Sequence, residues 1–355
     1  MASDIAFALA GLGGFNAHGA GFLQAARDNH IVPDLVTVTS GQILVAAAWL
    51  RGEPDLRSGL VDFNRENDPF ASIKIMSFGY PGVFRPAYGA AVARLMALPA
   101  FTDSFVDIFA HRFLPAQLYE PTRTAEFIDG LVATFNGASI EGKKIGILFN
   151  AYDPSSGKGV LYGNNEARKH MGTESNLPIK PTADVRYSDT GAAESTIRPI
   201  SREAVEAALW LSLYGFEGLP GGQMDGAYHR SCILSELHNF ARVFVARPLA
   251  NGWLGRTPRS YFDVQDWNTE MWFSVGYKAE VDAMKRINQL IKDGYIKDRK
   301  FKQVELIEIE PETPAGYFNY FIEKNAVYER ARFRADQVFK LLARRPNAPI
   351  EEASA

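Results

Sequence analysis

An abrupt change of pattern around Ser40 constrains the fold of this chain most. The apolar, mostly β-branched run from Leu35 to Thr39 stops at Ser40-Gly41, and an Ala-rich helical pattern over 42–52 follows at once. A serine at such a strand-to-helix turn holds its hydroxyl beyond the edge of the sheet, where the backbone N–H groups of the new helix stabilise negative charge. The pattern therefore predicts a nucleophile elbow with Ser40 as the nucleophile.

Short apolar runs alternate with helical patterns along most of the chain. Runs of this kind indicate strands buried on both faces, as in a mostly parallel sheet covered by helices on each side. The expected fold class is therefore α/β. The strict alternation in the last run predicts an edge strand. The expected strands are 5–10, 35–39, 144–151, 242–248 and 303–310, and the expected helices are 19–28, 42–52, 203–213, 274–292 and 325–343.

Residues 64–125 depart from this alternation, because aromatic residues there are mixed with turn formers. We expect an insertion, with helices near 90–98 and 105–113, that caps the sheet edge and lines a substrate pocket; a peripheral helical layer is the alternative. An apolar acyl chain needs an apolar pocket wall. The aromatic residues expected to supply this wall are Phe70, Phe78, Tyr80, Phe84 and Tyr88.

No linker or internal repeat divides the chain. We therefore expect a single domain over 1–343 that includes the insertion. The polar, turn-rich segment 173–198 predicts a long loop. The polar, Pro-containing tail 344–355 is expected to be disordered.

The composition excludes several classes of protein. A formal net charge of -3 over 355 residues gives no basic surplus that would indicate nucleic-acid binding. The single cysteine, Cys232, excludes an internal disulfide and suits a reducing compartment; we expect it to be buried and inert, in a helix or strand. Residues 1–4 lack a positively charged start, and the apolar stretch 31–50 is too interrupted to span a membrane. The expectation is a soluble, cytoplasmic protein.

A glycine-rich loop follows the first expected strand. Because glycine has no Cβ, the backbone N–H groups of Gly13 and Gly14 could approach a substrate closely and stabilise the oxyanion of an acyl-transfer intermediate. A dinucleotide-binding loop is the alternative for Gly11-x-Gly13. It is disfavoured because its sixth position is Asn16 and no acid that would bind ribose ends the second strand.

Asp225-Gly226 is the third feature that carries chemistry. A serine hydroxyl is a weak nucleophile until a base accepts its proton, and Asp225 is the candidate base. The two residues are 225 − 40 = 185 positions apart, so only the fold could bring them together. The ordinary alternatives are a helix N-cap role for Ser40 and an Asx-turn role for Asp225. A Ser–His–Asp triad that uses His229 is the alternative mechanism. His18, in the glycine-rich loop, is expected to be structural rather than to line the pocket, and the six histidines show no metal-ligand spacing.

Taken in order along the chain, these features resemble the patatin-like phospholipases. That family has a Gly-rich oxyanion loop, a G-x-S-x-G elbow and a D-G-[GA] aspartate. The resemblance covers about residues 5–250 and implies a three-layer α/β/α fold in which Ser40 attacks and Asp225 accepts its proton, with no metal or organic cofactor. The similar segments are 9–23, 38–52, 150–159, 207–216 and 224–227.

The chain departs from the family pattern at the elbow. Val38 and Gln42 stand where the family has glycine, and Phe15 and Asn16 replace an arginine and a glycine of the oxyanion loop. Tyr214 replaces a proline. Side chains at the elbow positions require a wider turn or a displaced helix, so we expect weak activity on generic esters. The residues expected to contact substrate are Phe15, Gln42 and Phe84.

The function that follows is a serine acyl hydrolase of the lipase or esterase type. Its expected substrate is the carboxylic ester of a lipid or of another apolar acyl group, with peripheral contact to a membrane surface and none to nucleic acid. An acyltransferase on the same scaffold is one alternative. A catalytically impaired member that binds an acyl ligand or a protein partner is another.

Overall fold

The computed structural model describes most of the chain. The described residues are 4–11, 16–57, 74, 77–79, 82–96, 104, 117–171, 197–247, 253, 257–297, 301–310 and 325–344. Several expectations lie outside these residues. They concern Gly13, Gly14, Phe15, Phe70, Tyr80, the helix near 105–113, most of the loop 173–198 and nearly all of the tail 344–355.

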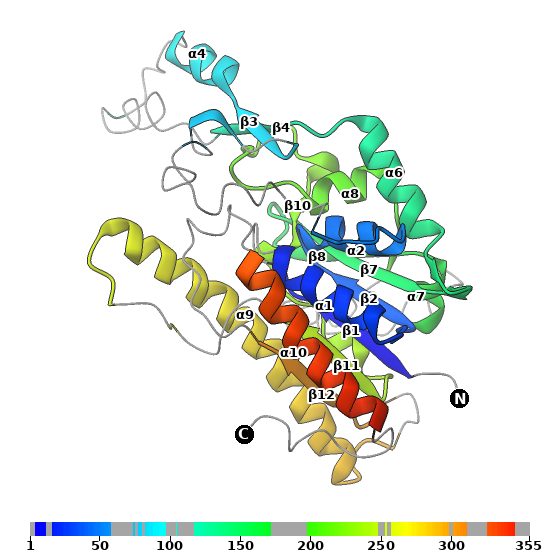
Figure 1. Cartoon of the computed structure of the whole chain (residues 1–355). Helices are drawn as coiled ribbons and strands as arrows, with labels where there is room; N and C mark the ends of the chain where they lie inside the picture. Colours follow the sequence, from blue (N-terminus) through cyan, green and yellow to red (C-terminus); the bar gives the residue numbers. More distant parts are fainter. Residues whose placement is uncertain are drawn as a thin grey trace.

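A mostly parallel sheet forms the centre of the fold (Figure 1). Over the described residues its strand order is β12-β11-β1-β2-β7-β8-β9, with β10 paired to β7 outside this path. Only the β7–β8 and β7–β10 pairs of this sheet are antiparallel. The expected α/β class and the edge position of the last strand are confirmed. The strands of this sheet are β1 (Ile5–Leu9), β2 (Leu35–Val38), β7 (Gly146–Asp153), β8 (Lys158–Gly163), β9 (Arg198–Pro199), β10 (Met224–Asp225), β11 (Arg242–Ala246) and β12 (Glu305–Ile309).

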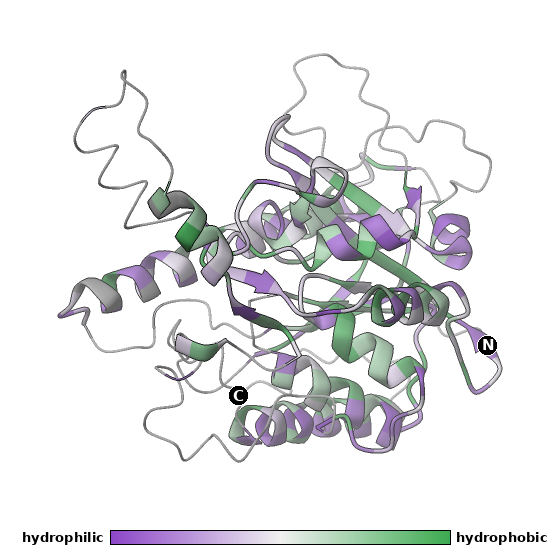
Figure 2. Ribbon diagram, turned by 90° about the horizontal axis from the view of Figure 1, so that it is seen from above, coloured by the Kyte–Doolittle hydropathy of each residue, from purple (hydrophilic) through white to green (hydrophobic). Residues whose placement is uncertain are grey.

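Helices cover both faces of the sheet, so the fold has three layers. Side chains alternate along β1: Phe7 and Leu9 face one helical layer, while Ala6 and Ala8 face the other. The first layer contains α1, α2, α6, α8 and α10; the second contains α7, α9 and the irregular segment 226–240. Figure 2 shows the central strands largely in the hydrophobic colour. The helices are α1 (Asn16–Asp28), α2 (Gln42–Leu50), α4 (Tyr88–Met96), α6 (Ala125–Asn136), α7 (Asn165–His170), α8 (Arg202–Ala208), α9 (Tyr261–Lys292) and α10 (Asn325–Arg344).

The long helix α9 begins well before the expected residue 274. Its start is fixed by a capping box in which the Ser260 side chain accepts from Asp263 N and the Asp263 carboxylate accepts from Ser260 N. The first half of α9 carries exposed Trp267 and Trp272, and Figure 1 shows this end extending away from the sheet. Periodicity marked only the half of the helix that packs on the sheet, because only there does burial impose a pattern.

Helix α8 is shorter than the expected 203–213, because the chain after Ala208 forms tertiary hydrogen bonds instead. Trp210 O accepts from Asp225 N at 3.0 Å, and Leu213 O accepts from the backbone of segment 118–119. Cys232 is buried as expected, but it lies in neither a helix nor a strand.

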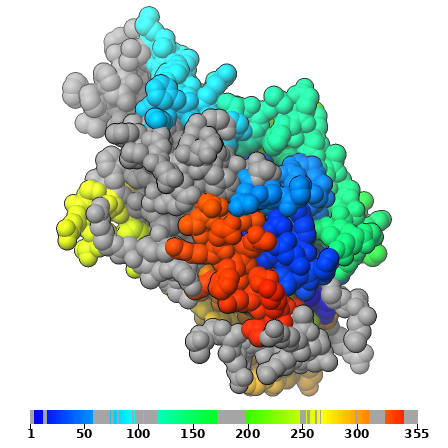
Figure 3. Space-filling model, viewed as in Figure 1, coloured from blue at the N-terminus to red at the C-terminus, as the bar shows by residue number. Residues whose placement is uncertain are grey.

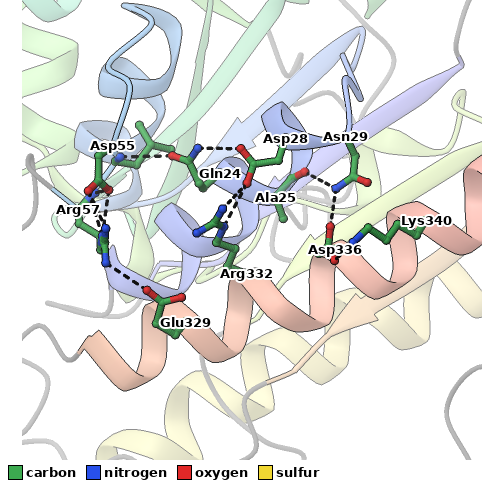
Figure 4. A network of polar contacts seen from close by, with 11 residues as sticks. Gln24, Ala25, Asp28, Asn29, Asp55, Arg57, Glu329, Arg332, Asp336 and Lys340 are labelled. Carbon is green, nitrogen blue, oxygen red and sulfur yellow. Dashed lines mark hydrogen bonds and ion pairs between the residues drawn. The ribbon is translucent and has the colours of Figure 1, made fainter.

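The C-terminal helix α10 packs along α1, as Figure 3 shows on one face of the molecule. Phe339 meets Phe22 of α1 at a ring-centroid distance of 5.6 Å in the core below. A polar network crosses the outer edge of this contact (Figure 4), in which Arg332 pairs with Asp28 at 2.8 Å. The first helix, α1, is thus packed between α2 and α10, and the first strand, β1, lies between β2 and β11.

The described part of 64–125 is anchored beside the sheet rather than within it. Strands β3 (Phe84–Pro86) and β4 (Tyr119–Pro121) form an antiparallel pair, and α4 confirms the helix expected near 90–98. A second small pair joins β5 (Ser139–Ile140) to β6 (Lys143–Lys144). Of the helices described, none combines the length and the apolar character that crossing a membrane requires. The described residues also contain no group of three or more His, Cys, Asp or Glu side chains that could hold a metal ion.

Candidate active site

Ser40 lies in a tight turn between β2 and α2. Its φ of 57° is in the left-handed region, which is uncommon for a residue with a side chain and is found at strained functional turns. Ser40 is only 2% exposed. Gly11, just after β1, packs directly on this turn, and a Cβ there would collide with Thr39 O and the Ser40 side chain. The backbone around Ser40 thus has the tight strand-to-helix turn that the sequence predicts.

The unequal lengths of β2 and β7 explain why Ser40 meets Asp225. β2 ends at Val38, opposite Phe149, while β7 continues to Asp153. Beyond the end of β2, the antiparallel strand β10 pairs with the same edge of β7 and places Asp225 opposite Ala151. Ser40 follows Val38 by two residues, as Ala151 follows Phe149. The serine turn and the aspartate therefore meet at one level of the sheet.

The Asp225 carboxylate is held by hydrogen bonds on both oxygens. Ser40 Oγ donates to Oδ2, and Ala227 N donates to Oδ1 at 2.9 Å. Asn150 of β7 fixes the turn that follows, because its amide nitrogen donates to Gly226 O at 3.1 Å and to Arg230 O at 2.9 Å. The expected meeting of Ser40 and Asp225 without a bridging histidine is confirmed. The Asx-turn alternative for Asp225 also holds, since one oxygen caps the turn while the other faces the serine.

Burial changes the acidity of this carboxyl group. Desolvation raises the pKa of Asp225 from 3.8 to about 7, against the opposing effects of the Ser40 and Ala227 hydrogen bonds and the Arg123 charge. A carboxylate with an ordinary pKa is too weak a base to accept a serine proton. With a pKa near neutrality, Asp225 is better matched to general-base work at physiological pH.

The side chains that replace the elbow glycines are accommodated without opening the turn. Val38 is fully buried in the core between the sheet and the first helical layer. Gln42 is 1% exposed and lies against Gly19 of α1, where a Cβ would collide with the Gln42 carboxamide. We expected a wider turn or a displaced helix. Instead, the absence of a side chain at Gly19 on the neighbouring helix leaves room for Gln42. A role for Gln42 in substrate binding stays a prediction.

The oxyanion glycines Gly13 and Gly14 lie outside the described residues, so their role stays a prediction. Gly41, which the sequence reasoning did not assign, offers another donor. In a nucleophile elbow the N–H of the residue after the nucleophile points at the oxyanion. Gly41 is partly exposed, and within the described segments no acceptor for its N–H is seen.

His18 and His229, the two histidines considered for the site, have structural surroundings. His229 stacks on Tyr152, with a ring-centroid distance of 5.6 Å, and burial lowers its pKa. Ser40 donates to Asp225 rather than to this imidazole, so the geometry favours the two-residue arrangement over the triad. His18 Nε2 donates to Ile309 O at 3.0 Å, and burial lowers its pKa to about 4, which keeps the ring neutral.

The aromatic residues expected to line a pocket differ in their surroundings. Phe84 is buried in a small cluster, with ring centroids 4.6 Å from Tyr119 and 6.4 Å from Tyr214. Phe78 and Tyr88 are exposed. Of these residues, Phe84 is thus the one that packs toward the segment preceding Asp225, and the pocket wall itself stays a prediction.

Two arginines near Asp225 were not predicted from the sequence as site residues. Arg230, on the turn after Asp225, is buried and pairs with Glu236 at 2.7 Å and Glu280 at 2.9 Å. Arg123 lies between β4 and α6, and its charge acts on Asp225 and Tyr214. Neither arginine belongs to a recognisable motif. Arg230 is near Asp225 because it lies five residues further along the same turn, whereas Arg123 comes near only through tertiary contacts.

Comparisons with known proteins add little to this geometry. Neither a scan against protein-family models nor a sequence search of curated proteins gave a match. Among solved structures, VipD from Legionella pneumophila aligns with a TM-score of 0.24 and 11% sequence identity, over 94% of this chain and 66% of that chain. What this chain does has therefore to be inferred from its own residues.

Proposed function

We propose that this protein is a serine acyl hydrolase in which Ser40 and Asp225 form the catalytic pair. One observation carries the proposal: Ser40 Oγ, in a strained turn at the sheet edge, donates to a buried carboxylate whose pKa is raised to about 7. A nucleophile, a base matched to neutral pH and a strained backbone are the features that mark a reactive serine.

The reaction proceeds in two halves. Ser40 Oγ attacks the ester carbonyl carbon as its proton passes to Asp225; the ester C–O bond then breaks, and the departing alkoxide takes that proton. A water molecule next gives a proton to Asp225 and attacks the acyl-Ser40 carbonyl. The Ser40 oxygen leaves and recovers the proton. Gly13, Gly14 and Gly41 are the proposed N–H donors to the oxyanion, and one such donor contributes on the order of 3 kcal/mol in comparable enzymes.

The proposed substrate is an ester with an apolar acyl group. The patatin-like order of motifs in the sequence supports this class, as does the buried aromatic cluster around Phe84 beside the segment that precedes Asp225. The same scaffold could pass the acyl group to an alcohol or thiol instead of water. Product analysis with added acceptors distinguishes hydrolysis from transfer.

A fluorophosphonate probe tests the proposal directly. We expect a covalent adduct at Ser40, located by mass spectrometry, and its loss in Ser40→Ala. Ser155→Ala, at an exposed turn, is the matched control and keeps the adduct. An unlabelled wild-type Ser40 in folded protein would contradict the proposal and favour a non-catalytic acyl-binding protein.

The elbow side chains give a second test. We expect slow hydrolysis of p-nitrophenyl esters by the wild type. In Gln42→Gly, a faster rate on such esters would mean that the side chain obstructs the site, whereas a loss on longer acyl esters would mean that it contacts substrate. Wild-type rates equal to those of ordinary serine esterases would contradict the idea that Val38 and Gln42 slow the enzyme.

A further inference from the structure

Arg123 acts on Asp225 through its charge, and contacts on both sides of it in the chain hold its connection in place. On one side, Leu118 N and Tyr119 N both donate to Leu213 O at 3.0 Å, which ties β4 to the segment leading to Asp225. On the other side, Thr124 caps α6 by accepting from Phe127 N. The short connection that carries Arg123 is therefore fixed at both ends, and the side chain is half-buried.

The guanidinium of Arg123 has no partner among the described residues. Its Nε is buried without a hydrogen bond, and no ion pair or hydrogen bond to the side chain is found in the described segments. Burial lowers the pKa of Arg123, while the charges of Tyr214 and Asp225 oppose this effect. A buried guanidinium nitrogen without a hydrogen-bond acceptor is costly, and a bound ligand that accepts from it would offset this cost.

Tyr214 supplies a second donor at the same place. It is 1% exposed, yet its hydroxyl has no hydrogen-bond partner within the described part of the chain. Burial raises the pKa of Tyr214 to about 12, so the phenol keeps its proton and can donate it. The Tyr214 ring packs edge-on against Trp210, whose carbonyl accepts from Asp225 N. A buried phenol donor and a half-buried guanidinium donor, whose charges act on each other and on Asp225, thus lie in the neighbourhood of the base, both without an acceptor among the described residues.

We propose that Arg123 and Tyr214 form an anion-binding subsite that holds a phosphate or carboxylate group of the ligand next to Ser40. As a feature of substrate recognition, this inference rests on the proposed function and makes the preferred substrate an acyl ester that also carries a negative charge. Guanidinium groups bind such oxyanions through two parallel N–H donors, and the bonds are strong because both partners are charged. The cation also offsets the repulsion between a bound anion and Asp225.

Binding of uncleavable probes tests the subsite without requiring turnover. Hexyl phosphate, heptanoate and 1-hexanol share a six-carbon tail and differ in the head group. We expect the wild type to bind at least one of the two anions about tenfold more tightly than the alcohol by calorimetry at fixed ionic strength, as for a charge-assisted hydrogen bond. Inorganic phosphate alone shows whether the subsite recognises a free anion or needs the attached chain.

Arg123→Gln should abolish the preference for the anion, and Tyr214→Phe should reduce it by about threefold. Arg123→Lys, which keeps the charge but loses the two parallel donors, should retain part of it. Arg202→Gln is the matched control, because Arg202 is an exposed arginine of α8 that pairs with Asp129. It should leave all affinities unchanged.

Equal affinity for all three probes would overturn the subsite, as would an equal loss for all three in a folded Arg123→Gln protein. A fluorophosphonate adduct at Ser40 without any anion preference would sustain the hydrolase and reject the subsite. Anion binding through Arg123 without an adduct would sustain the subsite and reject the hydrolase.

Discussion

Two arginines flank the Asp225 turn, and their surroundings differ completely. Arg230 donates to both oxygens of Glu236, at 2.8 and 2.7 Å, and to both oxygens of Glu280, at 3.1 and 2.9 Å. Arg123, on the other side, has no such partner among the described residues. The Arg230 charge is buried and the Arg123 charge is partly so, but among the described residues only Arg230 is compensated by carboxylates.

The difference separates a structural role from a recognition role. Burial alone would raise the pKa of Glu280, but the charge and hydrogen bonds of Arg230 outweigh it and lower that pKa. Glu280 lies on α9, so this cluster attaches the long helix to the turn that follows Asp225. In the described segments, Arg123 joins no two elements by ion pairs. Removing it should therefore affect binding more than stability.

The largest expected effect is the loss of stability when Arg230, the paired arginine, is replaced. Arg230→Met leaves two buried carboxylates without their cation, and losing one partner of a buried ion pair costs about 3–5 kcal/mol. Urea denaturation should show this loss in the free energy of unfolding. Arg123→Met is the matched comparison and should change the same quantity by less than about 1 kcal/mol. Equal losses in the two variants would remove the distinction between the arginines.

The next largest effect concerns how the ionisation of Asp225 changes stability with pH. Because the pKa of Asp225 is raised from 3.8 to about 7 in the fold, its contribution to stability is fully present below pH 3.8 and is lost as pH rises through about 7. The cost of the charged form is then ~4 kcal/mol. Asp225→Asn avoids this cost, so it should be inactive yet more stable than wild type at pH 8, with the gain shrinking toward pH 4. A gain independent of pH would contradict the raised pKa.

A smaller effect is expected in the pH dependence of the rate. Only ionised Asp225 can accept the serine proton, so kcat/KM should fall about tenfold per pH unit below the midpoint, which lies at about 7. Since the Arg123 charge lowers this pKa, Arg123→Gln should move the midpoint upward. A wild-type midpoint below 6.5 would instead favour His229, whose pKa is lowered from 6.5.

The smallest effect is expected for an exposed paired arginine. Arg332 binds Asp28 across the contact between α10 and α1 (Figure 4), where solvent screens the charges. Exposed ion pairs contribute about 0.2–1 kcal/mol. Arg332→Ala should therefore lower the free energy of unfolding by no more than this, and raising the salt concentration should reduce the difference further. A loss of stability comparable with that of Arg230→Met would mean that an ion pair stabilises this protein to the same extent whether it is exposed or buried.

The sequence by itself determined the elements whose patterns are local. The apolar run before Ser40 and the Ala-rich run after it define the strand, the turn and the helix, because burial and helical periodicity act on neighbouring residues. The Asp225-Gly226 turn was also visible, since Asp-Gly is a turn signal. The alternating pattern near Glu305–Ile309 gave the edge strand correctly.

Only the tertiary structure decided how these pieces meet. Asp225 faces Ser40 because β10 pairs with the edge of β7 that β2 leaves free, and no local pattern encodes which strand occupies an edge. Gly19 makes room for Gln42 across two helices, a compensation that neither residue reveals alone. Arg123 reaches the site through backbone bonds to a segment about ninety positions further along the chain. Close packing and burial join residues that are distant in sequence, so their chemistry emerges only once the chain is folded.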